Sequence, residues 1–153
     1  MHIVFVDILP KKLKGGFKTR LLDEFVGNPQ LLSPSTLAFL GDGVYELMVR
    51  ERLLNAGSMP AGKLHALSVK KVKAAAQSAA WNELLDVCTE AEADILRRGR
   101  NANVKPPKSC TPEQYHKATG IEALFGYLYL LGQTERLREL FELVYCAAAT
   151  VEA

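Results

Sequence analysis

The chain has 153 residues, of which 48% are hydrophobic and 24% charged, and its formal net charge is +2. This length corresponds to one domain, and this composition excludes a largely disordered protein. The net charge is too small to indicate a nucleic-acid partner by itself. The charges are segregated, however, with five acids and no base in residues 83–94 and five bases and no acid in residues 97–108. One part of the surface is therefore expected to attract polyanions and another to repel them.

Cysteine usage and the N-terminus indicate the cellular compartment. Cys88, Cys110 and Cys146 are odd in number and contain no CxxC pair, which argues against a disulfide framework and against a zinc site. The first residues, MHIVFVDIL, are apolar but too short to span a bilayer, contain Asp7 and follow no basic residue. We therefore expect neither a signal peptide nor a membrane anchor. The expected location is the cytoplasm.

Residues 1–32 are expected to form an N-terminal extension whose structure the sequence leaves undefined. They contain a basic, glycine-containing piece, KKLKGGFK, and a weak helical pattern over residues 19–26. Two interpretations stay open for this extension: a tail that packs or stays loose, and an RNA-binding arm. The domain itself is expected over residues 33–153.

Helix boundaries are marked by capping residues. Ser33 and Pro34 suit the N-cap and the first helical position, and an apolar helical pattern follows to about Leu54. Thr89 and Glu92 have the spacing of a capping box, and Thr111 with Pro112 begins another helix. The later helices are predicted over residues 58–67, 68–87, 90–99, 111–131 and 134–149, with Ser68 capping or bending the second of these and Gly120 loosening the fourth.

The stretch RRGRNANVKPPKSC, which begins at Arg97, is predicted to be the one long loop, because it is rich in Arg, Lys, Asn and Pro. No segment alternates with period two for long enough to form a strand. The sequence therefore predicts an all-α fold of about six or seven helices.

Two carboxylates interrupt otherwise apolar helices. Asp42 lies within AFLGDGVYELMV and Glu122 within ATGIEALFGYLYLLG. An ionised carboxylate among apolar side chains needs a partner, and for each acid alone that partner can be a nearby Lys or Arg on the helix surface. Two such acids in glycine-containing apolar helices also indicate a shared site for a hard cation such as Mg²⁺, which water and phosphate oxygens would complete.

These helices carry a resemblance. FLGDGVYELMV resembles the signature helix of the ribonuclease III family, and GIEALFGYLYLLG resembles its second metal-binding helix. The dipeptide LH at Leu64, Gln77, the RRGRNA run and YHKATGIEALFGYLYL together resemble Mini-ribonuclease III, a branch without a double-stranded RNA-binding domain. The resemblance covers about residues 35–145. It implies a ribonuclease III-type endonuclease domain over residues 33–153.

By this resemblance Asp42 and Glu122 are catalytic and bind Mg²⁺, with Mn²⁺ as a substitute. The implied protein is a homodimer packed through the Asp42 helices that cleaves double-stranded RNA and matures the ends of the 23S ribosomal RNA precursor. Larger members of the family carry two further acids, at the positions of Ala38 and Thr119 in this chain. Mini-ribonuclease III resembles this chain in lacking both acids. The alternative is a non-catalytic RNA-binding or ribosome-associated module on the same fold.

RNA binding is expected to rest on phosphate and 2′-hydroxyl contacts, with a solvated basic loop as the alternative. Of the three lysines at 70, 71 and 73 only part can face the RNA, because they point around their helix. The predicted RNA-binding residues are Arg97, Arg98, Arg100, Asn101, Lys105, Lys108, Lys70, Lys73, His116 and Lys117.

Four residues are assigned supporting roles: Glu46, His65, Gln77 and Tyr115. Glu46 either assists Asp42 through a water or pairs with Arg50 one turn later. His65 is interpreted as a hydrogen-bonded interior or interface residue, with a catalytic base as the alternative, and Gln77 is interpreted in the same way. Tyr115 is placed beside the scissile phosphate, whereas Tyr127, Tyr129 and Trp81 are predicted to belong to the core.

Overall fold

The structure is a computed structural model that describes residues 21–22 and 24–151. Over these residues the chain forms seven α-helices and one 3₁₀ helix, and none of them lies in a strand, which confirms the all-α class. The elements are η1 (Pro29–Leu31), α1 (Pro34–Asn55), α2 (Ala61–Val72), α3 (Ala74–Ser78), α4 (Trp81–Val87), α5 (Glu90–Arg100), α6 (Pro112–Leu130) and α7 (Thr134–Val151).

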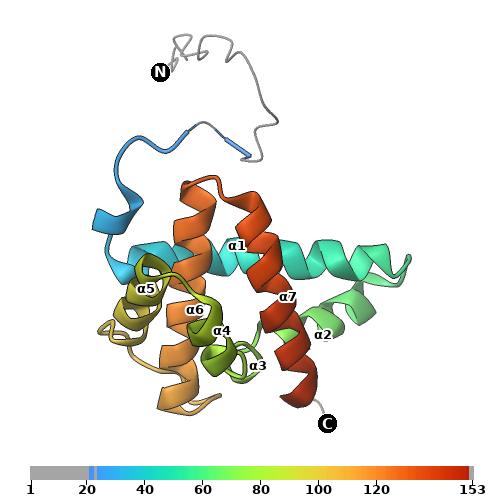
Figure 1. The fold of residues 1–153 in the computed structure, drawn as a ribbon. Coiled ribbons are helices and arrows are strands. Elements are labelled where there is room, and N and C mark those ends of the chain that lie inside the picture. The colour runs from blue at the N-terminus through green and yellow to red at the C-terminus, as the bar shows by residue number, and fades with distance from the viewer. Residues whose placement is uncertain (1–20, 23, 152–153) are drawn as a thin grey trace, which may run out of the picture.

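Helix α6 is the centre of the fold. It packs against α1, α5 and α3, and Figure 1 shows α6 and α7 both crossing the long axis of α1. Every residue from Ala118 to Leu128 is buried except Glu122, so this helix is apolar on all sides, as expected for the core helix of a domain. Glu122 is therefore the exception in the most buried segment of the chain.

The capping residues start the two central helices as predicted. The Ser33 side chain accepts a hydrogen bond from the Thr36 N–H at 3.2 Å, with Pro34 at the first helical position of α1. At the start of α6, the Thr111 hydroxyl and the Gln114 side chain satisfy each other's backbone N–H groups. Each cap satisfies N–H groups that a helix leaves without an internal partner.

Glycines let three helices approach one another closely. A Cβ atom at Gly41 on α1 would overlap the carbonyl oxygen of Glu122, and one at Gly126 would overlap the carbonyl oxygen of Leu37. On the other side of α6, a Cβ at Gly99 of α5 would lie 2.6 Å from the Gly120 Cα. Gly120 therefore packs tightly against α5 and does not loosen α6.

The predicted long helix over residues 68–87 is wrong: the structure divides this stretch among α2, α3 and α4. The chain leaves the helical conformation at Lys73, where ψ is 149°, and turns again before Trp81. Ser68 is not a cap, because it is buried inside α2 and its hydroxyl donates to the His65 carbonyl at 2.9 Å. The breaks allow α3 to turn and pack against both α6 and α7.

Two further boundaries differ from the predictions. Residues 97–100 form the last turn of α5 and not the start of a loop. The weak helix over residues 19–26 falls partly outside the described residues, and its described part is not helical. By contrast, Trp81 and Tyr127 are buried as predicted, and Tyr129 is half-buried with its hydroxyl accepting from the Leu21 N–H.

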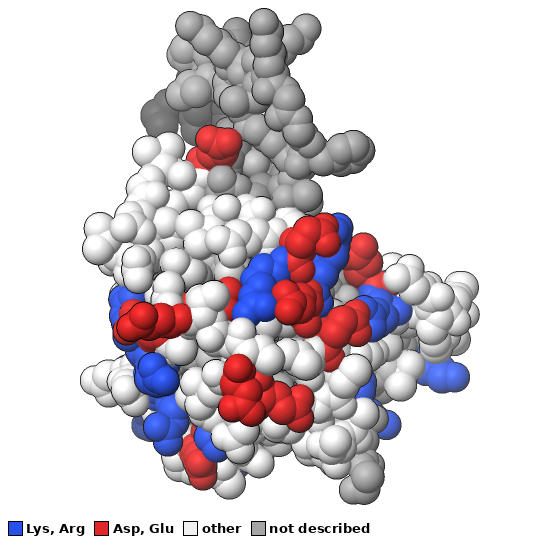
Figure 2. Space-filling view, in the orientation of Figure 1, with Lys and Arg blue, Asp and Glu red and all other residues white. Residues whose placement is uncertain are grey.

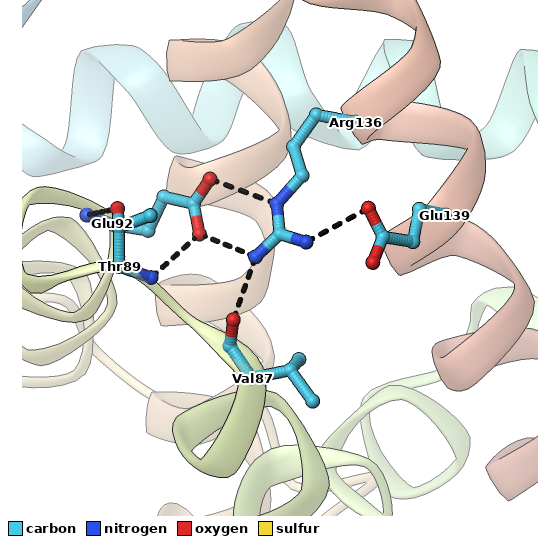
Figure 3. A network of polar contacts seen from close by, with 5 residues as sticks. All are labelled: Val87, Thr89, Glu92, Arg136 and Glu139. Atoms are coloured by element: carbon cyan, nitrogen blue, oxygen red, sulfur yellow. Dashed lines mark hydrogen bonds and ion pairs between the residues drawn. The ribbon is translucent and has the colours of Figure 1, made fainter.

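A buried ion pair fastens α7 to the junction between α4 and α5 (Figure 3). Arg136 donates to both carboxylate oxygens of Glu92 at 3.0 and 2.8 Å and to the Val87 carbonyl at 2.7 Å. Glu92 also accepts from the Thr89 N–H at 2.9 Å, so one acid serves both the α5 cap and the pair.

Along the part of the chain that the structure describes, no helix is both long and apolar enough to cross a membrane.

Candidate active site

The crossing of α1 and α6 brings the two predicted carboxylates together. Asp42 directly follows Gly41, the residue whose backbone meets the Glu122 carbonyl, so the two acids flank the point of closest approach. The negative charge of Asp42 raises the pKa of the Glu122 carboxyl group. A side chain at position 41 would separate the helices, and the pair therefore depends on this glycine.

The two carboxylates differ in burial. Asp42 is exposed, so the expectation that it lies among apolar side chains is wrong: Gly41 and Tyr45 of α1 are buried, but Asp42 faces outwards. Partial desolvation and the charge of Glu46 still raise the pKa of Asp42. Glu122 is half-buried, and burial followed by the Asp42 charge raises the pKa of this carboxyl group to about 8.

This donor set fits a divalent cation. Two carboxylates that repel each other become a favourable pair when a cation lies between them, and oxygen donors are those that Mg²⁺ prefers. Over the described residues no cluster of three or more acids, histidines and cysteines is arranged to hold a metal. A cation held by Asp42 and Glu122 would therefore take its remaining ligands from water and phosphate.

The last turn of α5 carries arginines to this part of α6. Arg97 and Arg100 are exposed, and the Arg100 guanidinium lies 6.0 Å from the centre of the Trp81 ring. Gly99 fixes the position of this turn by packing against Gly120 and Ala123, on both sides of Glu122 in the sequence. The helix end that carries both arginines is therefore packed against α6, the helix that also carries Glu122.

Arg98 has a different role from its neighbours. Its side chain is half-buried and donates to the carbonyl oxygens of Gln30 and Leu32, at 2.9 and 3.1 Å, so it holds the η1 segment against α5. Those hydrogen bonds occupy the guanidinium that the sequence assigned to RNA. A basic residue in a positively charged run cannot be given a partner from sequence alone.

The remaining predicted RNA contacts lie in two groups. Asn101, Lys105 and Lys108 are exposed in the connection between α5 and α6, and Lys70 and Lys73 are exposed where α2 meets α3. Figure 2 shows basic side chains along the left margin of the molecule, where Figure 1 places the end of α5 and this connection. The first group lies on the connection into α6, and the second lies at the junction between α2, which packs against α1, and α3, which packs against α6.

Residues near the start of α6 are less free to bind RNA. Lys117 pairs with Glu113 at 2.9 Å and is only 23% exposed. His116 is half-buried with its ring near Tyr115, and its Nδ1 atom is buried with no hydrogen-bond partner among the described residues. Both side chains lie on α6 before Glu122, and Lys117 is engaged by Glu113 rather than by either of the two predicted carboxylates.

The supporting residues separate into surface and interior positions. Glu46 pairs with Arg50 at 2.7 Å, which agrees with the second of its two predicted roles. His65 is exposed beside a pocket of about 260 Å³, so it is not an interior residue. Gln77 is fully buried in α3, as predicted. Gly41 and Gly126 also belong to this site, and the sequence signal for them is a glycine inside each of two apolar helices, which marks a close helix approach.

Comparison with known proteins identifies the class. The Ribonuclease III domain matches residues 35–133, and the chain belongs to the ribonuclease III family. It is therefore a ribonuclease III-type endoribonuclease.

Relatives define the branch more closely. The chain is 49% identical to the Mini-ribonuclease 3 of Symbiobacterium thermophilum over 118 residues, which cover 76% of this chain and 91% of the relative. It is 46% identical to the Mini-ribonuclease 3 of a Thermoanaerobacter species, over 73% of this chain and 80% of that one. A crystal structure of a Fusobacterium nucleatum protein superposes with a TM-score of 0.69 and 32% identity, covering 74% of this chain and 92% of that one.

Proposed function

We propose that the protein is a Mg²⁺-dependent endoribonuclease that cleaves double-stranded RNA and matures the ends of the 23S ribosomal RNA precursor in the cytoplasm. One observation carries the chemistry: Glu122, the sole incompletely buried residue in the buried run of α6, meets Asp42 across a glycine crossing. The names of the relatives support the branch, and the ribonuclease III family as a whole acts on double-stranded RNA with divalent metals.

The carboxylate pair supplies the metal site in this mechanism. Asp42, which is exposed, and Glu122, which is half-buried, would hold the cation where a phosphodiester can reach it from solvent. When bound, Mg²⁺ would activate a water molecule and offset negative charge on the scissile phosphate. Burial of Glu122 limits the water around its carboxylate and strengthens its electrostatic interactions.

The flanking bases would position the RNA backbone. Arg97 and Arg100 at the end of α5, Lys105 and Lys108 in the following connection, and Lys73 at the α2–α3 break are exposed. Contacts to phosphates orient a duplex without reading its bases, and A-form RNA offers few base edges in its accessible groove. We therefore expect binding that is steeply salt-dependent and selects for structure more than for sequence.

A homodimer packed through α1 completes the proposal. Phe39, Leu47 and Leu54 on α1 are 85%, 51% and 61% exposed, and large apolar side chains in this arrangement are typical of an interface. Beside them lies a groove of about 630 Å³ between α1 and the facing ends of α6 and α7, lined in part by Leu40 and Val44. A symmetric pair of sites would match the two strands of a duplex.

The test is cleavage of an end-labelled, structured ribosomal RNA fragment with Mg²⁺, with Mn²⁺ or with EDTA. The wild-type chain is compared with Asp42→Asn, Glu122→Gln and the control Glu135→Gln, an exposed acid of α7 paired with Arg138. Discrete cuts on both strands that need the metal and both site acids, but not Glu135, support the proposal. RNA that is bound but uncut under every condition would leave the non-catalytic binding module instead.

A further inference from the structure

Gln77 is a buried polar side chain without a hydrogen bond. It lies in α3 with 0% of its surface exposed, and neither Nε2 nor Oε1 has a partner among the described residues. The other buried polar side chains, Ser68, Thr119 and Glu92, all make hydrogen bonds. A buried amide without partners destabilises a fold, so its presence needs an explanation beyond packing.

The neighbour of this amide is the site carboxylate. Helix α3 packs against α6, and the Gln77 amide lies beside Glu122, where it favours the ionised carboxylate. The two groups are close without having the geometry of a formed hydrogen bond. Glu122 thus meets Asp42 from α1 and Gln77 from α3, and both neighbours reach it through helices that pack on α6.

We propose that Gln77 is a positioning residue: its Nε2–H group donates to the Glu122 carboxylate and fixes the orientation in which Glu122 and Asp42 bind a divalent cation. This inference rests on the proposed function. Carboxylates that ligate metals are themselves held by hydrogen bonds, and a site with only two acids depends more on their orientation. An amide suits this place because it donates without a positive charge that would compete with the cation.

A structural role predicts a different result from a positioning role. Gln77→Met keeps the length and approximate volume of the side chain and removes both unsatisfied polar atoms. If Gln77 served only the core, this change would leave metal binding untouched. If Gln77 positions Glu122, the variant should be as stable as the wild type or more stable in EDTA, but should bind divalent ions more weakly.

The experiment compares the full-length wild type with Gln77→Met and the control Ser68→Ala, which alters another buried polar residue. Mn²⁺ affinity without RNA is measured by electron paramagnetic resonance of the free ion, stability by thermal unfolding in EDTA, and cleavage over a range of RNA concentrations. We expect Gln77→Met to lower Mn²⁺ affinity or kcat by about 10–100-fold while KM for RNA stays near the wild-type value. Ser68→Ala should lower the Tm without changing Mn²⁺ affinity.

The outcomes separate this inference from the function on which it rests. A wild type that binds Mn²⁺ and cleaves, with Gln77→Met equal to it in both, overturns the inference and leaves the proposed function standing. A wild type that neither binds Mn²⁺ nor cleaves overturns both. If Gln77→Met does not fold, Gln77→Asn decides: it keeps the amide but shortens the side chain by one methylene and withdraws the donor from Glu122, so Mn²⁺ should raise the Tm less than in the wild type, and an unchanged rise overturns the inference.

Discussion

Two glutamates in the interior of this protein have opposite environments. Glu92 is 4% exposed, and although burial alone would raise its pKa, the hydrogen bonds and charge of Arg136 and the Thr89 N–H lower it. Glu122 is half-buried, and burial and the charge of Asp42 raise its pKa to about 8. The first carboxylate has all its donors supplied by the chain and fastens two helices together. The second has the neutral Gln77 amide beside it and no paired base among the described residues, so its charge is available to a cation.

The difference between the two glutamates is tested most directly by Glu122→Gln, which should reduce Mg²⁺-dependent cleavage by at least about 10²–10³-fold. The same change should stabilise the protein in EDTA. The unfolded state releases this proton near pH 4.5 and the folded state only near 8, so wild-type stability falls as the pH rises between these values. In urea unfolding at pH 7, the unfolding free energy of Glu122→Gln should exceed that of the wild type by about 1–3 kcal/mol. This is less than the full pKa shift of Glu122 corresponds to, because Glu122 is not fully buried.

A loss of stability in Glu122→Gln without added metal would contradict this account of the site. Raising Mg²⁺ should narrow the difference between the two proteins, because the cation stabilises only the wild-type pair.

The glycine crossing that creates the Glu122 site can be tested with Gly41→Ala. The added methyl group would overlap the Glu122 carbonyl oxygen, which is backbone and cannot move aside. We expect a loss of more than about 3 kcal/mol in unfolding free energy, measured by denaturant titration. Gly62→Ala in α2 is the matched control, since a Cβ there meets nothing within 4 Å, and it should be neutral or stabilising by up to about 1 kcal/mol.

Removing the partner of Glu92 should make it resemble Glu122. Arg136→Met leaves a buried carboxylate without its paired base and with the Thr89 N–H as its remaining backbone donor, and we expect a loss of about 2–4 kcal/mol in unfolding free energy. Arg138→Met breaks only the exposed pair with Glu135 and should cost less than about 0.5 kcal/mol. Cleavage per folded molecule should be unchanged in both variants. Equal stability of the two variants would show that the Glu92 pair contributes no more than a surface contact.

Glu92 should also contribute to acid sensitivity. Because its folded-state pKa is lowered below 4.5, its stabilisation is present above about pH 5 and is lost as the pH falls through and below 4.5. Thermal unfolding from pH 3 to 7 should therefore show a smaller loss at low pH for Glu92→Gln than for the wild type. A parallel decline of the two proteins would assign acid sensitivity to other groups.

The smallest expected effects concern the basic residues. Lys105→Ala and Lys108→Ala should each reduce the slope of log affinity against log salt for duplex RNA by about 1, because each removes one phosphate contact. Arg98→Ala should leave this slope unchanged and lower the Tm, since Arg98 binds the Gln30 and Leu32 carbonyls. A reduced slope for Arg98→Ala would return this residue to the RNA-binding set.

Local signals predicted the helices that carry the site. Ser33 with Pro34, Thr89 with Glu92, and Thr111 with Pro112 start α1, α5 and α6 because a cap is formed by residues within one turn of each other. The order of residues around Asp42 and Glu122 also indicated the family, which the comparisons confirm.

The sequence by itself therefore determined the fold class and the family and indicated the two acids proposed for the site, since caps, apolar periodicity and motif order are properties of short stretches. Only the tertiary structure decided that Asp42 faces outwards, that the chain breaks at Lys73, and that Arg98 is used inside the protein. The same holds for the unpaired amide of Gln77 beside Glu122. These features depend on contacts between helices distant in sequence, whose close approach is set by glycines and by packing around α6.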